Sequence, residues 1–357
     1  MGRRYALFFC CLLLGCSDEQ AGGRDGAARS DAEVDMARAD FRPGEAAVTD
    51  GSLPVIAGDL GAIVAAMPFV PKGGGYSPPA KDELQAFEAG ITTLLLGQHE
   101  SAASLLGKAG LEAVVLSETG GQKLLLVREP AASTARGWGL YVFDVSPSRP
   151  DLVIEVPHTR FDEMTEDQGA EVFVALGPAA LMVAGTHRCA STVASPCDGT
   201  TRACSSSSTD EPHTVSDAAH FTDGPFHAAH RAVTAQLPEA VAIQLHGFAR
   251  AAGEPHAVVS DGTTLSAPST SLSNRLAAAL AKELGLAVES CNQSHTMDLC
   301  GSTNVQGRLS NGSPAPCTVA ASAASGRFVH LEQSKEIRGA QRAEVLAALK
   351  SVFPSKR

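Results

Sequence analysis

The feature that most constrains the fold of this chain is an alternation of apolar strands and helical segments that begins at residue 151. The strand-like segments read DLVIEVPH, AALMVAGTHR, AVAIQLHG, HAVVS and RFVHLEQS. Between them, apolar residues recur at helical spacing over about 166–176, 223–236, 272–284 and 339–352. Buried strands that alternate with helices are typical of a largely parallel sheet. We therefore predict an α/β fold with a mixed, mainly parallel central sheet flanked by helices.

The segment before residue 151 has a different pattern. Residues 81–109 predict one or two helices, and the short runs LEAVVLS, KLLLVRE and GLYVFDV follow. Polar and glycine-rich turns separate the second and third runs, which is typical of antiparallel neighbours. We expect these strands to form an antiparallel edge of the sheet.

The first residues, MGRRYALFFCCLLLGC, have two arginines, a short apolar stretch and then Leu-Leu-Gly-Cys. The stretch is too short to span a bilayer, and its end resembles a bacterial lipobox. We predict a lipoprotein signal peptide over 1–15 with Cys16 as the lipidated residue. The alternative is an ordinary signal peptide that contains a cysteine. Ser17 follows Cys16 where an aspartate would indicate the inner membrane, so we expect an outer-membrane protein facing the periplasm or the cell surface.

Residues 16–52 are rich in Ala, Gly and charged residues, which predicts a flexible tether, and residues 53–357 are long enough for one α/β domain. The formal charge is −11, and loss of Arg3 and Arg4 with the signal changes it to −13. This acidity argues against a nucleic-acid partner and leaves the lipid as the expected contact with a membrane.

Six cysteines remain after the signal and Cys16 are set aside, in two groups of three. An even count on an exported chain predicts disulfides, and because each group is odd, at least one bridge should link the groups if all six pair. A metal site is a weaker interpretation, because no CxxC spacing occurs. These residues are Cys189, Cys197, Cys204, Cys291, Cys300 and Cys317.

Polar side chains lie at or near the carboxyl ends of four predicted strands, where open α/β sheets place their ligand sites. The strands deliver His158 with Asp162 and Glu163, His187 with Arg188, His246 before Gly247, and His330 with Glu332. Two histidines and a carboxylate that leave a fourth position open are a standard set for catalytic zinc, and a further glutamate can then act as the general base. The sequence has no GxSxG motif, which would indicate a nucleophilic serine.

The order PHxxxxE, a later strand ending in HG, and HLExS resembles the zinc carboxypeptidase-like amidohydrolases over roughly residues 150 to 340. The nearest branches are the N-formylglutamate amidohydrolases and the phage-type poly-γ-glutamate hydrolases. The resemblance implies a carboxypeptidase-like (phosphorylase/hydrolase-like) fold and a Zn²⁺ ion held by His158, Glu163 and His246. It also implies that Glu332 is the general base.

Two departures leave the carboxylate ligand open. HTRF stands where the poly-γ-glutamate branch has HGGG, and Phe161 stands where the HxxE motif of true carboxypeptidases has its glutamate. Asp162 and Glu166 therefore remain alternatives to Glu163.

Five further residues are candidates for binding the substrate. Arg188 is either a carboxylate clamp or a structural ion pair, and Asp217 and His220 can hydrogen-bond a substrate. By the same resemblance, Asn304 and Arg308 would hold a terminal carboxylate. His227 and His230, three residues apart on a predicted helix, form a rival metal pair, although a helix face packed on the sheet explains them better. The expected substrate-binding residues are thus Arg188, His220, Asn304 and Arg308.

The sequence as a whole predicts a lipid-anchored, zinc-dependent amidohydrolase that cleaves an amide bond next to a carboxylate in an N-acyl or γ-glutamyl compound. One alternative is a zinc carboxypeptidase that acts on peptides or cell-wall stems. The other is a non-catalytic surface lipoprotein that binds a ligand with the same fold.

Overall fold

The computed structural model of this protein describes residues 52–131, 133–205 and 209–354. Residues 1–51 lie outside the described residues, and they hold the predicted signal peptide, Cys16 and nearly all of the predicted tether. Within the described ranges, no helix combines the length and the apolar character needed to cross a bilayer.

A ten-stranded sheet organises the described residues, and its strand order is β1-β2-β3-β4-β6-β5-β9-β12-β10-β11. A separate pair of two-residue strands, β7 and β8, joins antiparallel in a loop. The strands are β1 (Val55–Gly58), β2 (Glu112–Glu118), β3 (Lys123–Arg128), β4 (Leu140–Asp144), β5 (Arg149–Val156), β6 (Pro178–Val183), β7 (Thr200–Thr201), β8 (Glu211–Pro212), β9 (Val241–Phe248), β10 (Ala257–Ser260), β11 (Val288–Ser290) and β12 (Phe328–Ser334).

The centre of the sheet is parallel, because β6, β5, β9 and β12 run side by side in one direction. β4 pairs antiparallel with β6 on one side, and β10 pairs antiparallel with β12 on the other. The predicted α/β fold with a mixed, mainly parallel central sheet is therefore confirmed. The predicted antiparallel region is also present as β2, β3 and β4, although β1 adds an outer parallel strand beside β2.

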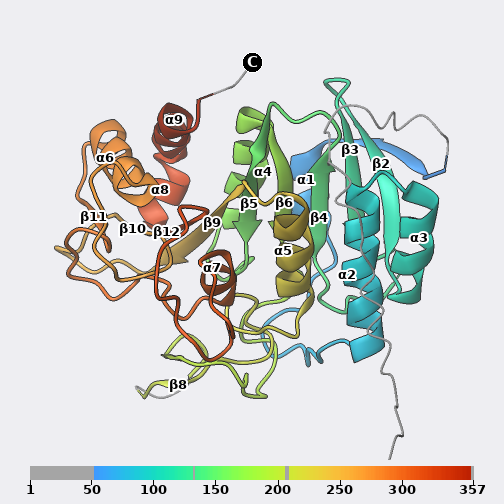
Figure 1. Cartoon of the computed structure of the whole chain (residues 1–357), viewed down its shortest axis with the longest axis horizontal. Coiled ribbons are helices and arrows are strands. Elements are labelled where there is room, and N and C mark those ends of the chain that lie inside the picture. Colours follow the sequence, from blue (N-terminus) through green and yellow to red (C-terminus); the bar gives the residue numbers. More distant parts are fainter. Residues whose placement is uncertain (1–51, 132, 206–208, 355–357) are drawn as a thin grey trace, which may run out of the picture. The chain divides into compact units, whose positions relative to one another are not determined.

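Helices cover both faces of the sheet (Figure 1). One hydrophobic cluster joins α1, α4, α6 and α9 to one face, and a second joins α2, α3 and α5 to the other. The helices are α1 (Leu60–Ala66), α2 (Lys81–Leu95), α3 (His99–Lys108), α4 (Thr165–Leu176), α5 (Pro225–Gln236), α6 (Leu272–Leu284), α7 (Val305–Ser310), α8 (Lys335–Gly339) and α9 (Arg342–Val352).

Residue alternation along the central strands separates the core from the candidate site. In β9, Ile243 and Leu245 pack into the cluster under α4 and α6, whereas Gln244 and His246 point to the opposite face. β12 has the same pattern, with Leu331 in that cluster and Glu332 on the other face. A strip of polar residues therefore lies on the side of the sheet that α5 and α7 cover.

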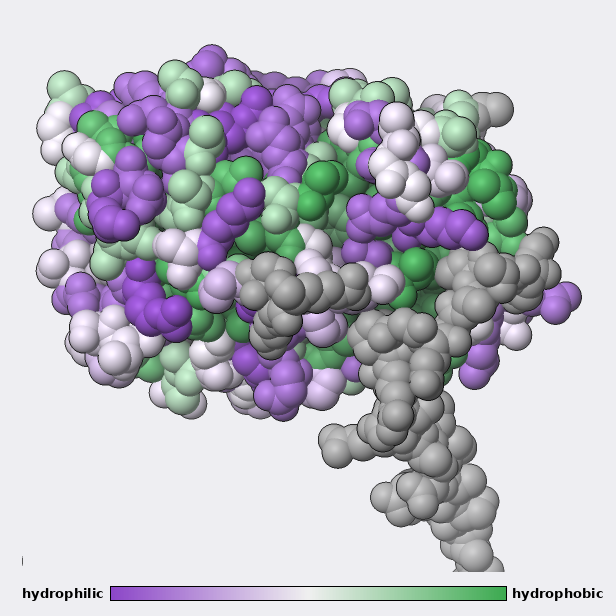
Figure 2. All heavy atoms as spheres, turned by 90° about the horizontal axis from the view of Figure 1, so that it is seen from above, coloured by the Kyte–Doolittle hydropathy of each residue, from purple (hydrophilic) through white to green (hydrophobic). Residues whose placement is uncertain are grey.

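The surface of the described residues has few large apolar side chains. Figure 2 shows hydrophilic and hydrophobic residues interspersed on the face seen from above. Isolated exposed apolar residues are normal on a folded domain and indicate no docking surface by themselves. The exposed ones are Val55, Val174, Val193, Leu265 and Val319.

Candidate metal centre

Three adjacent parallel strands carry the central side chains of the site. His158 follows the end of β5, and His246 lies near the end of β9. Glu332 of β12 is the direct neighbour of His246 in the parallel ladder, so the two side chains share a face of the sheet. The sequence placed these three residues at strand ends, and the structure brings them together.

Three ligand-type atoms converge at this point. His158 Nδ1 lies 3.1 Å from His246 Nδ1 and 3.1 Å from Asp162 Oδ2, and His246 Nδ1 lies 3.6 Å from the same oxygen. Atoms bound to one tetrahedral zinc ion at 2.0–2.1 Å stand roughly 3.3 Å apart. The three atoms thus have the spacing of three ligands around a single ion, with a fourth position left for water or substrate.

The carboxylate in this cluster belongs to Asp162, and the structure does not bring Glu163 to the histidines. The Glu163 side chain is 57 % exposed and pairs with Lys335 at 2.5 Å. Glu166, the other alternative, lies in the first turn of α4, where Oε2 accepts a hydrogen bond from the backbone of Arg160. Asp162, and not its neighbour Glu163, is therefore the carboxylate beside the two histidines.

The loop after β5 explains this replacement. The backbone NH of Asp162 donates to the carbonyl of His158, which folds the loop back toward β9. Arg160 and Met164 both have left-handed φ values, of 60° and 71°, which side chains other than glycine rarely adopt. Strained residues of this kind cluster at functional sites, and here they bracket Asp162. A local conformation that costs energy is thus what directs Asp162 inward and Glu163 outward.

Hydrogen bonds at the far nitrogen orient both imidazoles. His158 Nε2 lies 3.0 Å from Asp217 Oδ1, and His246 Nε2 lies 2.6 Å from Gln244 Oε1. Both partner oxygens accept, so in the neutral form of each ring Nε2 carries the proton and Nδ1 keeps the lone pair that a metal ion would use. Outer partners that fix tautomer and ring orientation in this way are typical of metal-binding histidines.

Charge at the centre favours a cation. Burial opposes ionisation of Asp162, but His158 and His246 outweigh it and hold the pKa of Asp162 below its usual range. Burial lowers the pKa of His246 to about 4, so this ring is neutral at physiological pH. Burial and Arg188 oppose protonation of His158, yet the two nearby aspartates outweigh them and raise its pKa. A proton or a metal ion between these atoms offsets the repulsion of their lone pairs.

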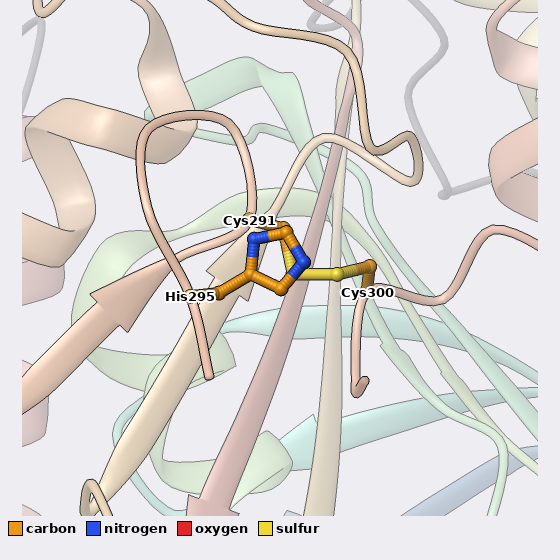
Figure 3. Close-up of side chains that lie close together, drawn as sticks. All are labelled: Cys291, His295 and Cys300. Carbon is orange, nitrogen blue, oxygen red and sulfur yellow. A yellow bond between two sulfur atoms is a disulfide. The ribbon is translucent and has the colours of Figure 1, made fainter. Parts of the chain in front are cut away.

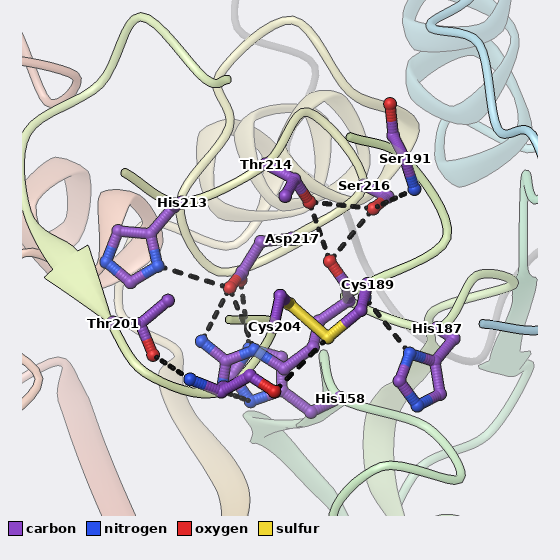
Figure 4. Close-up of a disulfide and its surroundings, with 12 residues drawn as sticks. His158, His187, Cys189, Ser191, Thr201, Cys204, His213, Thr214, Ser216 and Asp217 are labelled. Atoms are coloured by element: carbon purple, nitrogen blue, oxygen red, sulfur yellow. Dashed lines mark hydrogen bonds and ion pairs between the residues drawn. A yellow bond between two sulfur atoms is a disulfide. The ribbon is translucent and has the colours of Figure 1, made fainter. Parts of the chain in front are cut away.

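Asp217 joins the surrounding side chains into one network (Figure 4). Besides His158, it accepts two hydrogen bonds from Arg188, at 2.9 and 2.6 Å. His213 and His220 reach it through Nδ1, at 3.3 and 3.0 Å, and their rings stack 3.5 Å apart. Burial disfavours the ionised form of Asp217. Arg188, His220 and His158 outweigh this effect and hold the pKa of Asp217 well below its usual range. Asp217 is therefore a buried anion that fixes four side chains.

Glu332 is the remaining carboxyl group at the site. Its side chain is only 12 % exposed, Oε2 has no hydrogen-bond partner among the described residues, and Oε1 lies 3.8 Å from His330 Nε2. Burial, followed by the charge of Asp162, raises its pKa to about 8. A carboxyl group poised near neutrality and without a structural partner has the properties of a general acid or base.

The predicted substrate-binding residues have structural partners instead. Arg188 donates Nε and Nη2 to Asp217, and only its Nη1, 3.5 Å from His158 Nδ1, faces the centre. Asn304 caps α7 and donates to Gln244. Arg308 donates to Asp198 and to the carbonyls of Ser302, Pro316 and Cys317. His220 is held by Asp217, as described above. Asn304 and Arg308 thus shape the loops around the site.

The rival metal pair predicted on α5 is buried in the fold. His230 is fully buried and binds Glu155 and Ser310, and His227 is buried on the same face of α5. His187 accepts a hydrogen bond from the backbone of Cys189 and is half-buried. Ser310, His230 and Glu155 stand in the order of a nucleophilic triad, but Ser310 is buried at the end of α7. Neither His227 nor His230 belongs to a group of three close ligand-type atoms among the described residues.

The six cysteines form three disulfides. Cys189 pairs with Cys204 and Cys291 pairs with Cys300, while Cys197–Cys317 links the two groups, as the odd counts required. His295 lies beside Cys291 and Cys300 (Figure 3), but their sulfurs are bonded to each other and offer no thiolate to a metal. Disulfides persist in oxidising compartments, which fits an exported protein.

Sequence reasoning missed three residues that shape the centre. Gln244 and Glu155 form a polar stripe with His246 on one face of β9 and β5, and the period-2 alternation of these strands could have shown it. Arg338 of α8 donates to the carbonyls of Glu163 and Gln333, so it ties the His158 loop to β12. No sequence pattern links positions so far apart.

Comparisons with known proteins were made for both sequence and structure. No family model matches the chain, and no curated protein matches its sequence. Among solved structures, a bacteriophage poly-γ-glutamate hydrolase is similar at 17 % identity and a TM-score of 0.32, over 58 % of this chain and 84 % of that one. A candidate metallopeptidase of Shewanella amazonensis is similar at 15 % identity and 0.31, over 76 % and 90 %. One of Shewanella baltica has 14 % identity and 0.32, over 75 % and 92 %. Likenesses of this size carry no functional argument, so the case for the site rests on its own geometry.

Proposed function

We propose that this protein is a zinc-dependent amidohydrolase whose ion is held by His158, Asp162 and His246. The observation that carries this proposal is the convergence of three lone-pair atoms at 3.1–3.6 Å beside the unpartnered carboxyl group of Glu332. Two imidazoles and one carboxylate with a free fourth position are the ligand set of catalytic rather than structural zinc. The donor set therefore fits the metal that the sequence resemblance implies.

The residues around the centre have distinct tasks. When bound, zinc supplies Lewis-acid chemistry, which lowers the pKa of water and polarises a carbonyl group. Glu332 accepts the proton of the attacking water at Oε2 and delivers it to the nitrogen of the leaving amine. A cation nearby also lowers the pKa of Glu332, which favours the ionised form that a base requires. Asp217 and Gln244 keep both histidines in the tautomer that binds metal.

We propose that the substrate has a carboxylate close to the scissile amide, as in N-acyl or γ-glutamyl compounds. Arg188 Nη1 faces the centre, 3.5 Å from His158 Nδ1. A guanidinium group with one nitrogen directed at the centre favours a ligand that carries a carboxylate. A carboxypeptidase would need Asn304 and Arg308 for a terminal carboxylate, and both are engaged within the fold.

We also propose that the protein is exported and anchored through lipid on Cys16, with its domain in the periplasm or at the cell surface. The three disulfides support export. Labelling with radioactive palmitate in cells tests the anchor, because Cys16→Ser should abolish incorporation. Equal labelling of this variant would contradict the lipidation.

The decisive experiment pairs adjacent carboxylates. Metal content is measured for the wild type and for Asp162→Asn, with Glu163→Gln as the matched control. We expect about one zinc per chain in the wild type and in the control, and at least ~100-fold weaker binding in Asp162→Asn, because losing even an outer partner costs 10–100-fold. Metal loss in Glu163→Gln alone would show that the ligand is assigned wrongly.

Activity is then measured on N-formyl amino acids, γ-glutamyl peptides and ordinary peptides. Glu332→Gln should keep its zinc and lose about 10²–10⁴-fold in rate. Hydrolysis of ordinary peptides with a free C-terminus, and of nothing else, would identify a carboxypeptidase. A wild type that binds no zinc and hydrolyses nothing would be a ligand-binding protein, and the proposal would be wrong.

A further inference from the structure

A buried chain of hydrogen bonds runs behind His246 and joins four secondary-structure elements. His246 Nε2 contacts Gln244 Oε1 at 2.6 Å, and Gln244 Nε2 donates to Glu155 Oε2 of β5 at 2.8 Å. The other Glu155 oxygen contacts His230 Nδ1 of α5 at 2.5 Å, and His230 Nε2 contacts Ser310 Oγ of α7 at 3.0 Å. The side chains of Glu155 and His230 are completely buried.

The chain has one direction in this structure, and Glu155 sets it together with Asn304, whose Oδ1 caps α7 and whose Nδ2 donates to Gln244. As a carboxylate, Glu155 can only accept hydrogen bonds, so Gln244 must turn its NH₂ group toward Glu155. The carbonyl oxygen of Gln244 then faces His246, and it also accepts from Asn304 Nδ2. Because this oxygen cannot donate, the proton of the neutral His246 ring must lie on Nε2. The lone pair of Nδ1 is thereby directed at His158 and Asp162.

We propose that Glu155, acting through Gln244, is a positioning residue that fixes the tautomer of His246 and so prepares Nδ1 to bind the metal. The metal part of this inference rests on the proposed function, whereas the tautomer is a property of the protein alone. His230 and Ser310 complete the chain by occupying the second oxygen of Glu155.

The two histidines of the centre are thus held in the same tautomer by different partners. His158 is bound directly by the carboxylate of Asp217, whereas an amide stands between His246 and its carboxylate. A third carboxylate against the imidazoles would add charge to a centre that already contains Asp162 and Asp217. The amide transmits the direction of the hydrogen bonds and keeps the charge of Glu155 one side chain farther away.

The test measures the tautomer of His246 by ¹⁵N NMR in metal-free protein at pH 7.5, with the signals assigned by comparison with His246→Gln. We expect the Nε2–H form in the wild type. In Glu155→Gln, residue 155 can donate as well as accept, so only Asn304 still holds the Gln244 amide, and the Nδ1–H tautomer should appear beside the Nε2–H form. Zinc affinity should fall by about 10–100-fold in the same variant. Ser310→Ala, which changes only the outer end of the chain, is the control and should preserve both values.

Several results would overturn the inference. An Nδ1–H tautomer in the wild type would do so by itself, even if the Glu155→Gln variant did not fold. An unchanged tautomer and zinc affinity in Glu155→Gln would do so as well, as would equal effects of Ser310→Ala. If no form binds zinc but the tautomer responds to Glu155→Gln as expected, the positioning role stands and the proposed hydrolase function fails.

Discussion

Replacing Glu332 with Gln should stabilise the metal-free protein, and the gain should grow as the pH rises. The pKa of Glu332 is raised from 4.5 to about 8 because burial and the charge of Asp162 disfavour its ionised form. The folded protein therefore retains a proton that the unfolded chain has already released above pH 4.5. Folding stability consequently falls with pH between about 4.5 and 8, and an amide at this position removes that loss.

The magnitude follows from the size of the shift. One pH unit corresponds to about 1.4 kcal/mol, so the 3.5 units between 4.5 and 8 set an upper limit of about 5 kcal/mol. Relaxation of the folded protein and entry of water reduce the free-energy cost of a buried charge. We expect the substitution to gain about 2–3 kcal/mol of stability at pH 8, and this gain should approach zero near pH 5. Guanidinium unfolding of both proteins from pH 5 to 8.5, with chelator present and disulfides intact, measures this difference.

Glu163→Gln is the matched control, because Glu163 is exposed and its pKa is lowered by Lys335. Ionisation of Glu163 favours the folded protein, whereas ionisation of Glu332 disfavours it. The Glu163→Gln variant should therefore gain no stability as the pH rises. A stability difference between wild type and Glu332→Gln that is the same at pH 5 and pH 8 would refute the reasoning. It would mean that Glu332 is solvated in the folded protein and ionises normally.

Two further predictions concern the framework of the site. A Cβ atom on Gly247 would lie 1.9 Å from Nη1 of the buried Arg338, so Gly247→Ala should destabilise the protein by about 2–3 kcal/mol. The control is Gly107→Ala at an exposed helix position, which should be neutral or slightly stabilising in thermal unfolding. Equal effects of the two substitutions would contradict the packing argument. Replacing both cysteines of the Cys197–Cys317 bridge by Ser should cost about 5 kcal/mol and opening Cys291–Cys300 about 2.6 kcal/mol, because the closed loops differ in length. Denaturant unfolding measures both, and a larger loss from the short loop would count against this explanation.

The central strands and the residues at their ends could be predicted from the sequence. Alternation of apolar strands and helical segments predicted a mainly parallel sheet, and parallel strands place their carboxyl ends at one edge of a sheet. His158, His246 and Glu332 therefore meet for a reason that is local to each strand. The same kind of reasoning required at least one disulfide between the two cysteine groups.

The carboxylate ligand could not be predicted in this way. Asp162 and Glu163 are adjacent and chemically alike, and the choice between them depends on the left-handed backbone at Arg160 and Met164. Sequence patterns record the average preferences of residues, and a strained loop departs from those preferences. The sequence also did not reveal the partners of Asn304 and Arg308, because these partners come from distant segments.

The sequence by itself thus determined which strands form the centre of the sheet and which side chains each strand presents at its end. Local propensity and the period of two along a strand are sufficient for that much. Only the tertiary structure decided which carboxylate joins the imidazoles, which nitrogen of each ring faces the centre and which arginine remains available there. Those choices depend on hydrogen bonds and charges between residues tens to hundreds of positions apart, such as Glu155 with His230 and Arg338 with Glu163, and no local pattern encodes them.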